Sequence, residues 1–207
     1  MTSTICLVRS GPTSWSAEGR LVGRRDLALS KEGCESLTTL AACLGPPQWT
    51  EIITSPMRRA VQTAEILADP GSSIAKDGRL APVDVGDHEG DTFASLATNP
   101  AWSAIQEEQG DTLLGGETLT ALVQRVSGSI EQARADNPDD SRLLFVSHQW
   151  PIAAALVHYL GLSPRAVARF SIAHGSACVI HVDDITHRAT LRAVNWACPG
   201  SSTLTPL

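Results

Sequence analysis

Short apolar runs that are too brief for helices recur along the chain and predict the strands of a buried sheet. The first covers residues 5–8 and ends abruptly in Arg9, Ser10 and Gly11. The run at residues 143–146 shows no polar alternation, which is typical of a strand that is covered on both faces. Three further runs predict strands at residues 51–54, 177–182 and 188–195.

Between these runs, apolar residues repeat at helical spacing and predict amphipathic helices. Ser30 is a suitable N-cap for a helix that runs to residue 44. The longest helical pattern follows Gly116-Glu117-Thr118 and ends at Asn137. Other helices are predicted at residues 57–68 and 151–160, with a short helical cover around Trp102 and Ile105.

Strands that alternate with helices indicate an α/β domain, a three-layer α/β/α sandwich with a mainly parallel sheet and helices on both faces. We predict a single domain over residues 1–198 and a disordered tail at 199–207. Residues 69–116 are the least regular part of the chain. We interpret them as an insertion that covers the functional site.

Composition narrows the classes of function. The 207 residues are 43% hydrophobic and 18% charged, with a net charge of -6, and no block of basic residues indicates a nucleic-acid partner. No apolar run is long enough to span a membrane, and the N-terminus does not resemble a signal peptide, so we expect a cytoplasmic protein. The oligomeric state is left open, with a homodimer as one option.

Cysteine and histidine spacing gives no sign of a metal site or another cofactor. The five cysteines are scattered without a C-x-x-C pair, which argues against a disulfide framework and a zinc site and favours small buried side chains. The six histidines show no H-E-x-x-H spacing.

Polar groups with the chemistry of an anion site follow three of the predicted strands. Arg9 and Ser10 follow the first, Arg59 lies in the first helical turn after the second, and His148 follows the third. The carboxyl ends of parallel strands meet at one edge of a sheet, so these side chains should converge. One guanidinium group can donate two parallel hydrogen bonds to two oxygens of a phosphate. Two arginines and a histidine at one place therefore predict a site for a small anionic metabolite.

The same residues lie in motifs that resemble the histidine phosphatase superfamily, the phosphoglycerate mutase-like proteins. The family's opening strand runs into Arg-His-Gly, and here it reads Leu7-Val8-Arg9-Ser10-Gly11. The other matching positions are Gly23 to Gly33 with Asp26 and Leu29, then Ser55, Arg59, Ala60, Gln62, Thr63, Ala64, Gly86, Glu89, Gly90, Gly116-Glu117-Thr118 and Ser147-His148. The resemblance implies that Arg9, Arg59 and His148 hold a phosphoryl group.

The chain departs from the family pattern at four places. The family's nucleophilic histidine, which becomes a phosphohistidine, corresponds to Ser10, and its general-acid glutamate corresponds to Pro82. Pro12 replaces an acidic residue, and the pair Gln149-Trp150 replaces small glycines. Four changes in four separate elements favour natural divergence over an engineered inactivation.

The resemblance places His148 across the phosphate from Ser10, so we expect a Ser–His pair in which His148 activates the Ser10 hydroxyl. Thr13 and Gln149 are further candidates for binding the anion. Asp84, His88 and Glu89 are candidate acid or base groups in a glycine-bounded loop.

Three functions compete at this point. The first is a phosphatase-like hydrolase that uses Ser10 and His148. The second is an enzyme repurposed as a lyase, cyclase, isomerase or acyl transferase on a small phosphate or carboxylate metabolite. The third is an anion-binding protein without catalysis.

Overall fold

The computed structural model describes residues 2–44, 49–114, 116–138 and 140–198. Within these residues the chain forms a six-stranded sheet in the order β3-β2-β4-β1-β5-β6. The strands are β1 (Thr2–Arg9), β2 (Glu51–Thr54), β3 (Ile74–Lys76), β4 (Arg142–Ser147), β5 (Ala177–Asp183) and β6 (Ala189–Trp196).

The helices follow the predicted apolar patterns closely. Ser30 caps the second helix as expected, since its Oγ accepts a hydrogen bond from the Gly33 N–H at 3.1 Å. The α-helices are α1 (Ser14–Ala17), α2 (Lys31–Leu44), α3 (Arg58–Leu67), α4 (Phe93–Leu96), α5 (Pro100–Gln106), α6 (Leu119–Asp136) and α7 (Gln149–Tyr159). Three short 3₁₀ helices are η1 (Gly78–Leu80), η2 (Gly86–His88) and η3 (Pro164–Arg169).

The sheet is mainly parallel, as predicted. Strands β3, β2, β4 and β1 pair in parallel, whereas β5 is antiparallel to β1 and β6 is antiparallel to β5. The sequence did not predict β3. Its Ala75 and Lys76 are exposed, so this short edge strand lacks the apolar run that marks the others.

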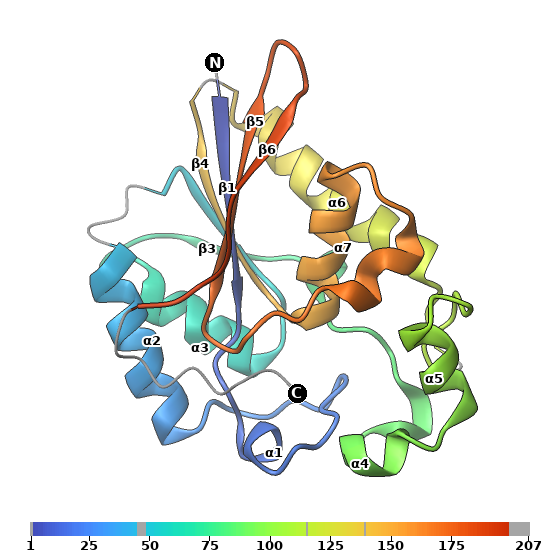
Figure 1. Ribbon diagram of the computed structural model, residues 1–207. Coiled ribbons are helices and arrows are strands. Elements are labelled where there is room, and N and C mark those ends of the chain that lie inside the picture. The colour runs from blue at the N-terminus through green and yellow to red at the C-terminus, as the bar shows by residue number, and fades with distance from the viewer. Residues whose placement is uncertain (1, 45–48, 115, 139, 199–207) are drawn as a thin grey trace.

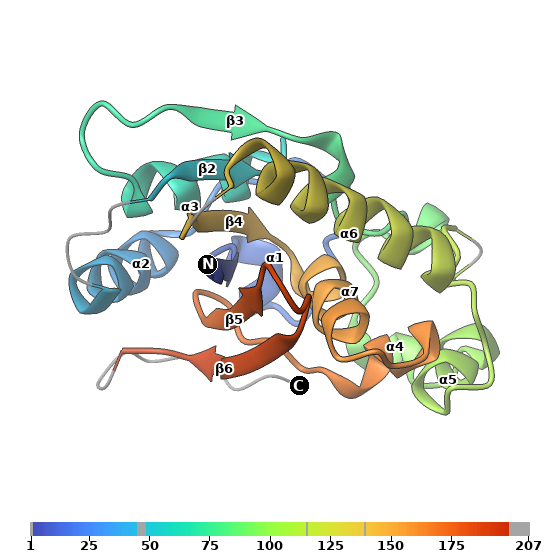
Figure 2. The same ribbon diagram turned by 90° about the horizontal axis from the view of Figure 1, so that it is seen from above.

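Helices cover both faces of the sheet, which confirms the three-layer α/β/α sandwich. Side chains of β1 alternate between two cores. Ile5 and Leu7 belong to the core under α6 and α7, and Cys6 and Val8 to the core under α2 and α3. Figure 2 shows these two pairs of helices on opposite sides of the strands.

The end of the sheet at which β1 finishes is covered by short helices. Figure 1 shows α1, α4 and α5 below this end. Residues 69–116 supply β3, η1, η2, α4 and α5. That this segment is an insertion, and that residues 1–198 form one domain, stay predictions. The predicted disordered tail, residues 199–207, lies outside the described residues.

One cysteine pair departs from the sequence expectation. Cys43 of α2 and Cys198 after β6 form a disulfide, with Cα atoms 5.8 Å apart. The inference against disulfides is therefore wrong for this pair, because residues 155 positions apart give no spacing signal. Cys6 and Cys178 are buried thiols, as expected.

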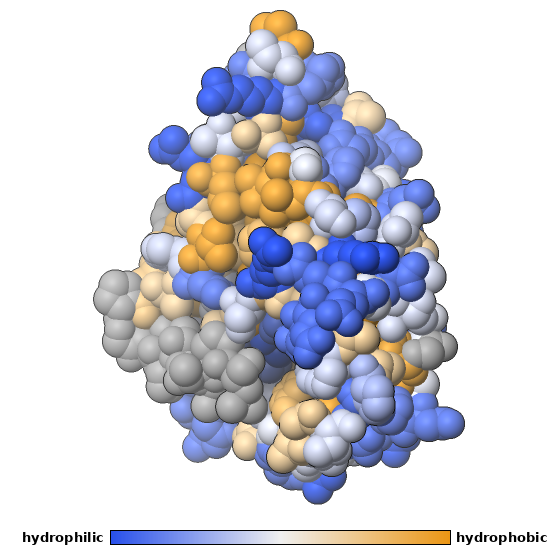
Figure 3. All heavy atoms as spheres, turned by 45° about the vertical axis from the view of Figure 1, so that its right-hand side comes forward, coloured by the Kyte–Doolittle hydropathy of each residue, from blue (hydrophilic) through white to orange (hydrophobic). Residues whose placement is uncertain are grey.

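The surface carries some apolar side chains, which Figure 3 shows gathered over part of one face. No helix in the described part of the chain is both long and apolar enough to cross a membrane. A homodimer and a cytoplasmic location stay predictions. The exposed large apolar residues are Leu160, Leu162, Ile185, Val194 and Trp196.

Replacement of glycine by alanine should have opposite effects on the free energy of unfolding at two positions. A Cβ atom at Gly116 would lie 2.1 Å from the Asp84 carbonyl oxygen, so Gly116→Ala must displace backbone. We expect it to lower the free energy of unfolding by about 1–3 kcal/mol. A Cβ atom at Gly128, inside α6, meets nothing within 4 Å, and Gly128→Ala should raise that free energy by about 0.5–1 kcal/mol. Chemical denaturation measures both, and effects of the same sign would contradict this packing.

Candidate active site

The parallel strands bring three polar strand ends together. The β1–β4 register pairs Arg9 with Ser147, and just beyond it the Ser10 N–H donates to the Ser147 carbonyl at 2.9 Å. On the other side of β4, the Ser55 N–H donates to the Val146 carbonyl at 2.9 Å. Ser10, Ser55 and His148 therefore leave the sheet as neighbours, each one residue past the end of its strand.

An antiparallel strand adds a residue that sequence reasoning missed. The Arg9 N–H donates to the Ser176 carbonyl, and the Gly175 N–H donates to the Arg9 carbonyl, both at 3.1 Å. This ladder carries His174, which precedes β5, to the side of Ser10. The His174 Nδ1 atom lies 3.0 Å from the Ser10 carbonyl oxygen.

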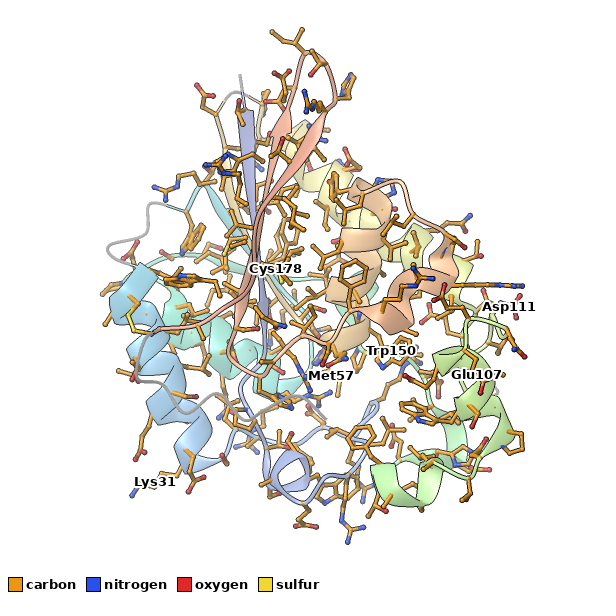
Figure 4. The ribbon with its side chains drawn as sticks, in the orientation of Figure 1. Lys31, Met57, Glu107, Asp111, Trp150 and Cys178 are labelled. Carbon is orange, nitrogen blue, oxygen red and sulfur yellow. A yellow bond between two sulfur atoms is a disulfide. The ribbon has the colours of Figure 1, made fainter. Side chains whose placement is uncertain are left out.

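Ser10, His148 and His174 line a cavity of about 800 Å³. Figure 4 shows Met57 at the start of α3 and Trp150 at the start of α7 at the same end of the sheet. The polar groups of the lining come from the strand ends, the segment around α1, the starts of α3 and α7, the end of α5, and the residues before β5. They are Arg9, Ser10, Ser16, Glu18, Arg20, Arg59, Gln106, His148, Gln149, Ser171 and His174.

Arg9 is held by three neutral acceptors. Its Nη1 atom donates to the Gln149 Oε1 at 2.7 Å and to the Ile172 carbonyl, and its Nη2 atom lies 2.6 Å from the His174 Nε2. Burial, followed by the charge of Arg59, lowers the pKa of Arg9 from 12.5 to about 9. The described residues give this guanidinium no carboxylate partner within ion-pair distance.

The contacts of His174 define its tautomer. Because Nη2 of Arg9 can only donate, the His174 Nε2 accepts, and the ring proton on Nδ1 is donated to the Ser10 carbonyl. Burial, and next the charge of Arg9, lower the pKa of His174 from 6.5 to about 3. The ring is therefore neutral and fixes both the Arg9 side chain and the Ser10 backbone.

Arg59 is buried, with 4% of its surface exposed. Its Nη1 and Nη2 atoms donate to the carbonyls of Arg25 and Gly23 at 2.8 and 2.9 Å. Burial lowers the pKa of Arg59 to about 10, against the opposing charges of Asp26 and Glu89. Like the partly buried Arg9, it is a cation that forms hydrogen bonds to neutral groups.

His148 has a different partner from the one expected. Its Nε2 atom lies 2.8 Å from the Ser55 Oγ, and the described residues include no hydrogen bond from His148 to Ser10. Burial, and then the charges of Arg59 and Arg9, lower its pKa well below 6.5, so the imidazole is neutral. Ser10 is 2% exposed, and no hydrogen bond from its Oγ occurs among the described residues.

Of the two further residues predicted to bind the anion, one lines the cavity and the other does not. Gln149 lines the cavity beside Arg9. Thr13 is fully buried and caps α1, where it bonds to Ser16, and it does not line the cavity.

The candidate acid or base residues also lie outside the lining. Asp84 pairs with Arg24 at 3.2 Å, the His88 Nδ1 lies 2.8 Å from Asp91, and Glu89 accepts from the Arg24 N–H.

Among the described residues that line the cavity, Glu18 is the only acidic one. Its carboxylate forms an ion pair with the Arg20 Nε at 2.6 Å. Pro82 lines the cavity too, so the position that the resemblance assigned to an acid carries no carboxylate.

A family model, histidine phosphatase superfamily (branch 1), matches residues 5–197. The chain belongs to this superfamily. It is 30% identical over 172 residues to a probable phosphoglycerate mutase of Erwinia tasmaniensis. The alignment covers 81% of this chain and 80% of that protein. A similar protein of an Escherichia coli strain is 32% identical with the same coverage.

Solved structures of phosphatases share the fold. A mycobacterial glucosyl-3-phosphoglycerate phosphatase in complex with VO3 is 26% identical, with a TM-score of 0.84 over 94% of this chain and 99% of that chain. A phosphoserine phosphatase of Entamoeba histolytica with 3-phosphoglyceric acid is 18% identical, with a TM-score of 0.84 over 94% and 98%. Relatives of this chain are thus phosphoglycerate mutase-like proteins and phosphatases of small phosphorylated metabolites.

The neutral His174 predicts a pH dependence of stability. Its folded pKa lies below the unfolded value of 6.5, so the unfolded chain binds the extra proton and stability falls as the pH drops from about 6.5 toward 3. His174→Asn should make the free energy of unfolding less dependent on pH in this window. The exposed His187, replaced as His187→Asn, is the control that should leave the slope unchanged. Equal slopes in the His174 variant and the wild type would contradict the assignment.

Proposed function

We propose that this protein is a hydrolase of small phosphate esters, with Ser10 in the place of the family's nucleophilic histidine. One observation carries the proposal: two cations, the buried Arg59 and the partly buried Arg9, lie at one cavity, and neither forms an ion pair within the described residues. Asp26 and Glu89 act on Arg59 from beyond ion-pair distance, and among the described residues Arg9 has no such counter-charge. A cation removed from water in this way is costly unless a ligand supplies the opposite charge. A phosphate dianion has the charge and the acceptor oxygens to do so.

Two features support a dianion in this cavity. Burial, and next the charge of Arg59, lower the pKa of Arg9, and the charge of a bound anion would oppose that shift. The first turn of α7 lines the same cavity, and among the described residues no side chain caps its free N–H groups. Helix N-termini with free N–H groups attract anions.

The chemistry follows from the position of Ser10. Its Oγ attacks phosphorus, the Oγ–P bond forms, and the bond from phosphorus to the ester oxygen breaks. We assign the hydroxyl proton to the neutral imidazole of His148, and Arg9 and Arg59 stabilise the charge on the phosphoryl oxygens. Water then hydrolyses the phosphoserine and releases inorganic phosphate.

The relatives support the class of substrate. One phosphatase with this fold is named for glucosyl-3-phosphoglycerate, and another is named for phosphoserine and holds 3-phosphoglyceric acid. The curated relatives are probable phosphoglycerate mutases. We therefore infer that the group bound by Arg9 and Arg59 is a phosphate rather than a carboxylate.

Binding without turnover is the second candidate. The hydrogen bond between His148 and Ser55 favours it, because Ser10 then lacks a bonded base. Phosphoryl-enzyme formation separates the two candidates.

Arg9→Ala should abolish binding of inorganic phosphate and lower hydrolysis of p-nitrophenyl phosphate by at least about 100-fold, since a charge-assisted contact to the phosphate is lost. Isothermal titration and a steady-state assay measure the two effects. Arg188→Ala removes an exposed arginine and is the matched control. Unchanged phosphate affinity in Arg9→Ala would refute the proposed site.

Ser10→Ala should remove a phosphoryl-enzyme that survives acid quenching, since phosphoserine is an acid-stable ester. Quenched reactions with ³²P-labelled substrate, followed by mass spectrometry of the labelled peptide, measure it. If the wild type binds phosphate but never acquires label or releases product, binding without turnover is the function. Hydrolysis that appears only in the double variant Ser10→His with Pro82→Glu would lead to the same conclusion.

A further inference from the structure

We propose that the substrate is an aryl phosphate, in which the phosphate is carried on the oxygen of an aromatic ring; the inference rests on the proposed function. Two independent observations lead to it. One is the aromatic wall of the cavity, and the other is the shortage of proton donors beside the phosphate site.

The aromatic wall is made of Phe93, Trp102 and Trp150, all of which line the cavity. The ring centroids of Phe93 and Trp102 lie 6.0 Å apart, and those of Trp102 and Trp150 lie 6.3 Å apart with their planes at 70°. These are favourable distances for aromatic clusters, and such rings bind another ring edge-on or stacked. The adjoining apolar lining is Leu21, Val85, Val167 and Phe170.

The wall continues directly from the anion site. His148, Gln149 and Trp150 are consecutive at the start of α7, and all three line the cavity. Gln149 accepts from Arg9, while the next side chain, Trp150, contacts Trp102 of α5. A ligand that places its phosphate at Arg9 therefore meets indole rings where its body begins.

The shortage of proton donors selects the same ligand. Glu18 is the only acidic residue among the described lining residues, and it is paired with Arg20. His148 and His174 are both neutral, with pKa values lowered by burial and by the arginines, so neither imidazole holds a proton in excess. An alkyl ester needs an acid to protonate its departing alkoxide, whereas a phenol with a pKa of about 10 leaves as the anion.

The step balances without a general acid. The Ser10 Oγ–P bond forms as the aryl O–P bond breaks, and the bonding electron pair goes to the aryl oxygen. The Ser10 proton goes to His148, which returns it to the Ser10 oxygen when water hydrolyses the phosphoserine, and the phenolate takes a proton from water after it departs. Throughout this step, Arg9 and Arg59 stabilise the negative charge on the phosphoryl oxygens.

Titration with two phosphonates tests the recognition of the ring. Methylphosphonate and phenylphosphonate carry the same head group on a P–C bond that cannot be hydrolysed, and they differ only in the body. We expect phenylphosphonate to bind at least about tenfold more tightly, since the ring buries apolar surface. Trp102→Ala and Trp150→Ala should each reduce that preference and leave methylphosphonate affinity unchanged.

Trp196→Ala, at an exposed tryptophan on β6, is the matched control and should keep the full preference. Thermal unfolding establishes that each variant is folded, and Trp102→Phe should restore most of the preference if Trp102→Ala is unstable. Equal affinity for the two phosphonates in the wild type would overturn the aryl assignment alone. Failure of both phosphonates and of inorganic phosphate to bind would overturn the proposed function.

A series of substituted phenyl phosphates and one alkyl phosphate tests whether the leaving group departs without a general acid. Values of kcat/KM should rise steeply as the pKa of the leaving phenol falls, and the alkyl ester should be at least about 100-fold slower. Similar rates for alkyl and aryl esters would overturn the aryl assignment. Absence of turnover on every ester, together with tight phenylphosphonate binding, would refute hydrolysis and leave the aryl recognition supported.

Discussion

The pairing of β1 on both of its edges is the constraint on which the rest of the structure depends. One edge pairs in parallel with β4, and the other pairs antiparallel with β5. The parallel edge sets Ser10 beside Ser147, and the antiparallel edge sets Arg9 beside Ser176. A register shift of one residue on either edge would reverse which side chains enter the two cores, and it would separate the cavity residues.

Much of this arrangement could be predicted from the sequence. Strands β1 and β4 each contain an uninterrupted apolar run that leads into Arg9-Ser10 or Ser147-His148, so both the buried sheet and the polar edge leave a local signal. The long helix α6 and the Ser30 cap leave signals of the same kind. These features depend on short-range periodicity, which the order of residues records directly.

Other features depend on contacts between distant segments and leave no local signal. His174 reaches the site only because β5 runs antiparallel to β1, and an apolar run does not reveal its direction. The partner of His148 is Ser55 because β2 lies next to β4. Thr13 looked like an anion ligand beside Ser10, but one turn of α1 directs its hydroxyl to Ser16.

The disulfide has a topological consequence for the strand that organises the site. The bond between Cys43 and Cys198 closes a covalent ring that contains β2 to β6, while β1 and α1 lie on the arm that precedes it. Ring closure restricts the unfolded chain only between the two cysteines. The central strand β1 therefore lies outside this covalent ring, and hydrogen bonds and side-chain packing hold it in its place between β4 and β5.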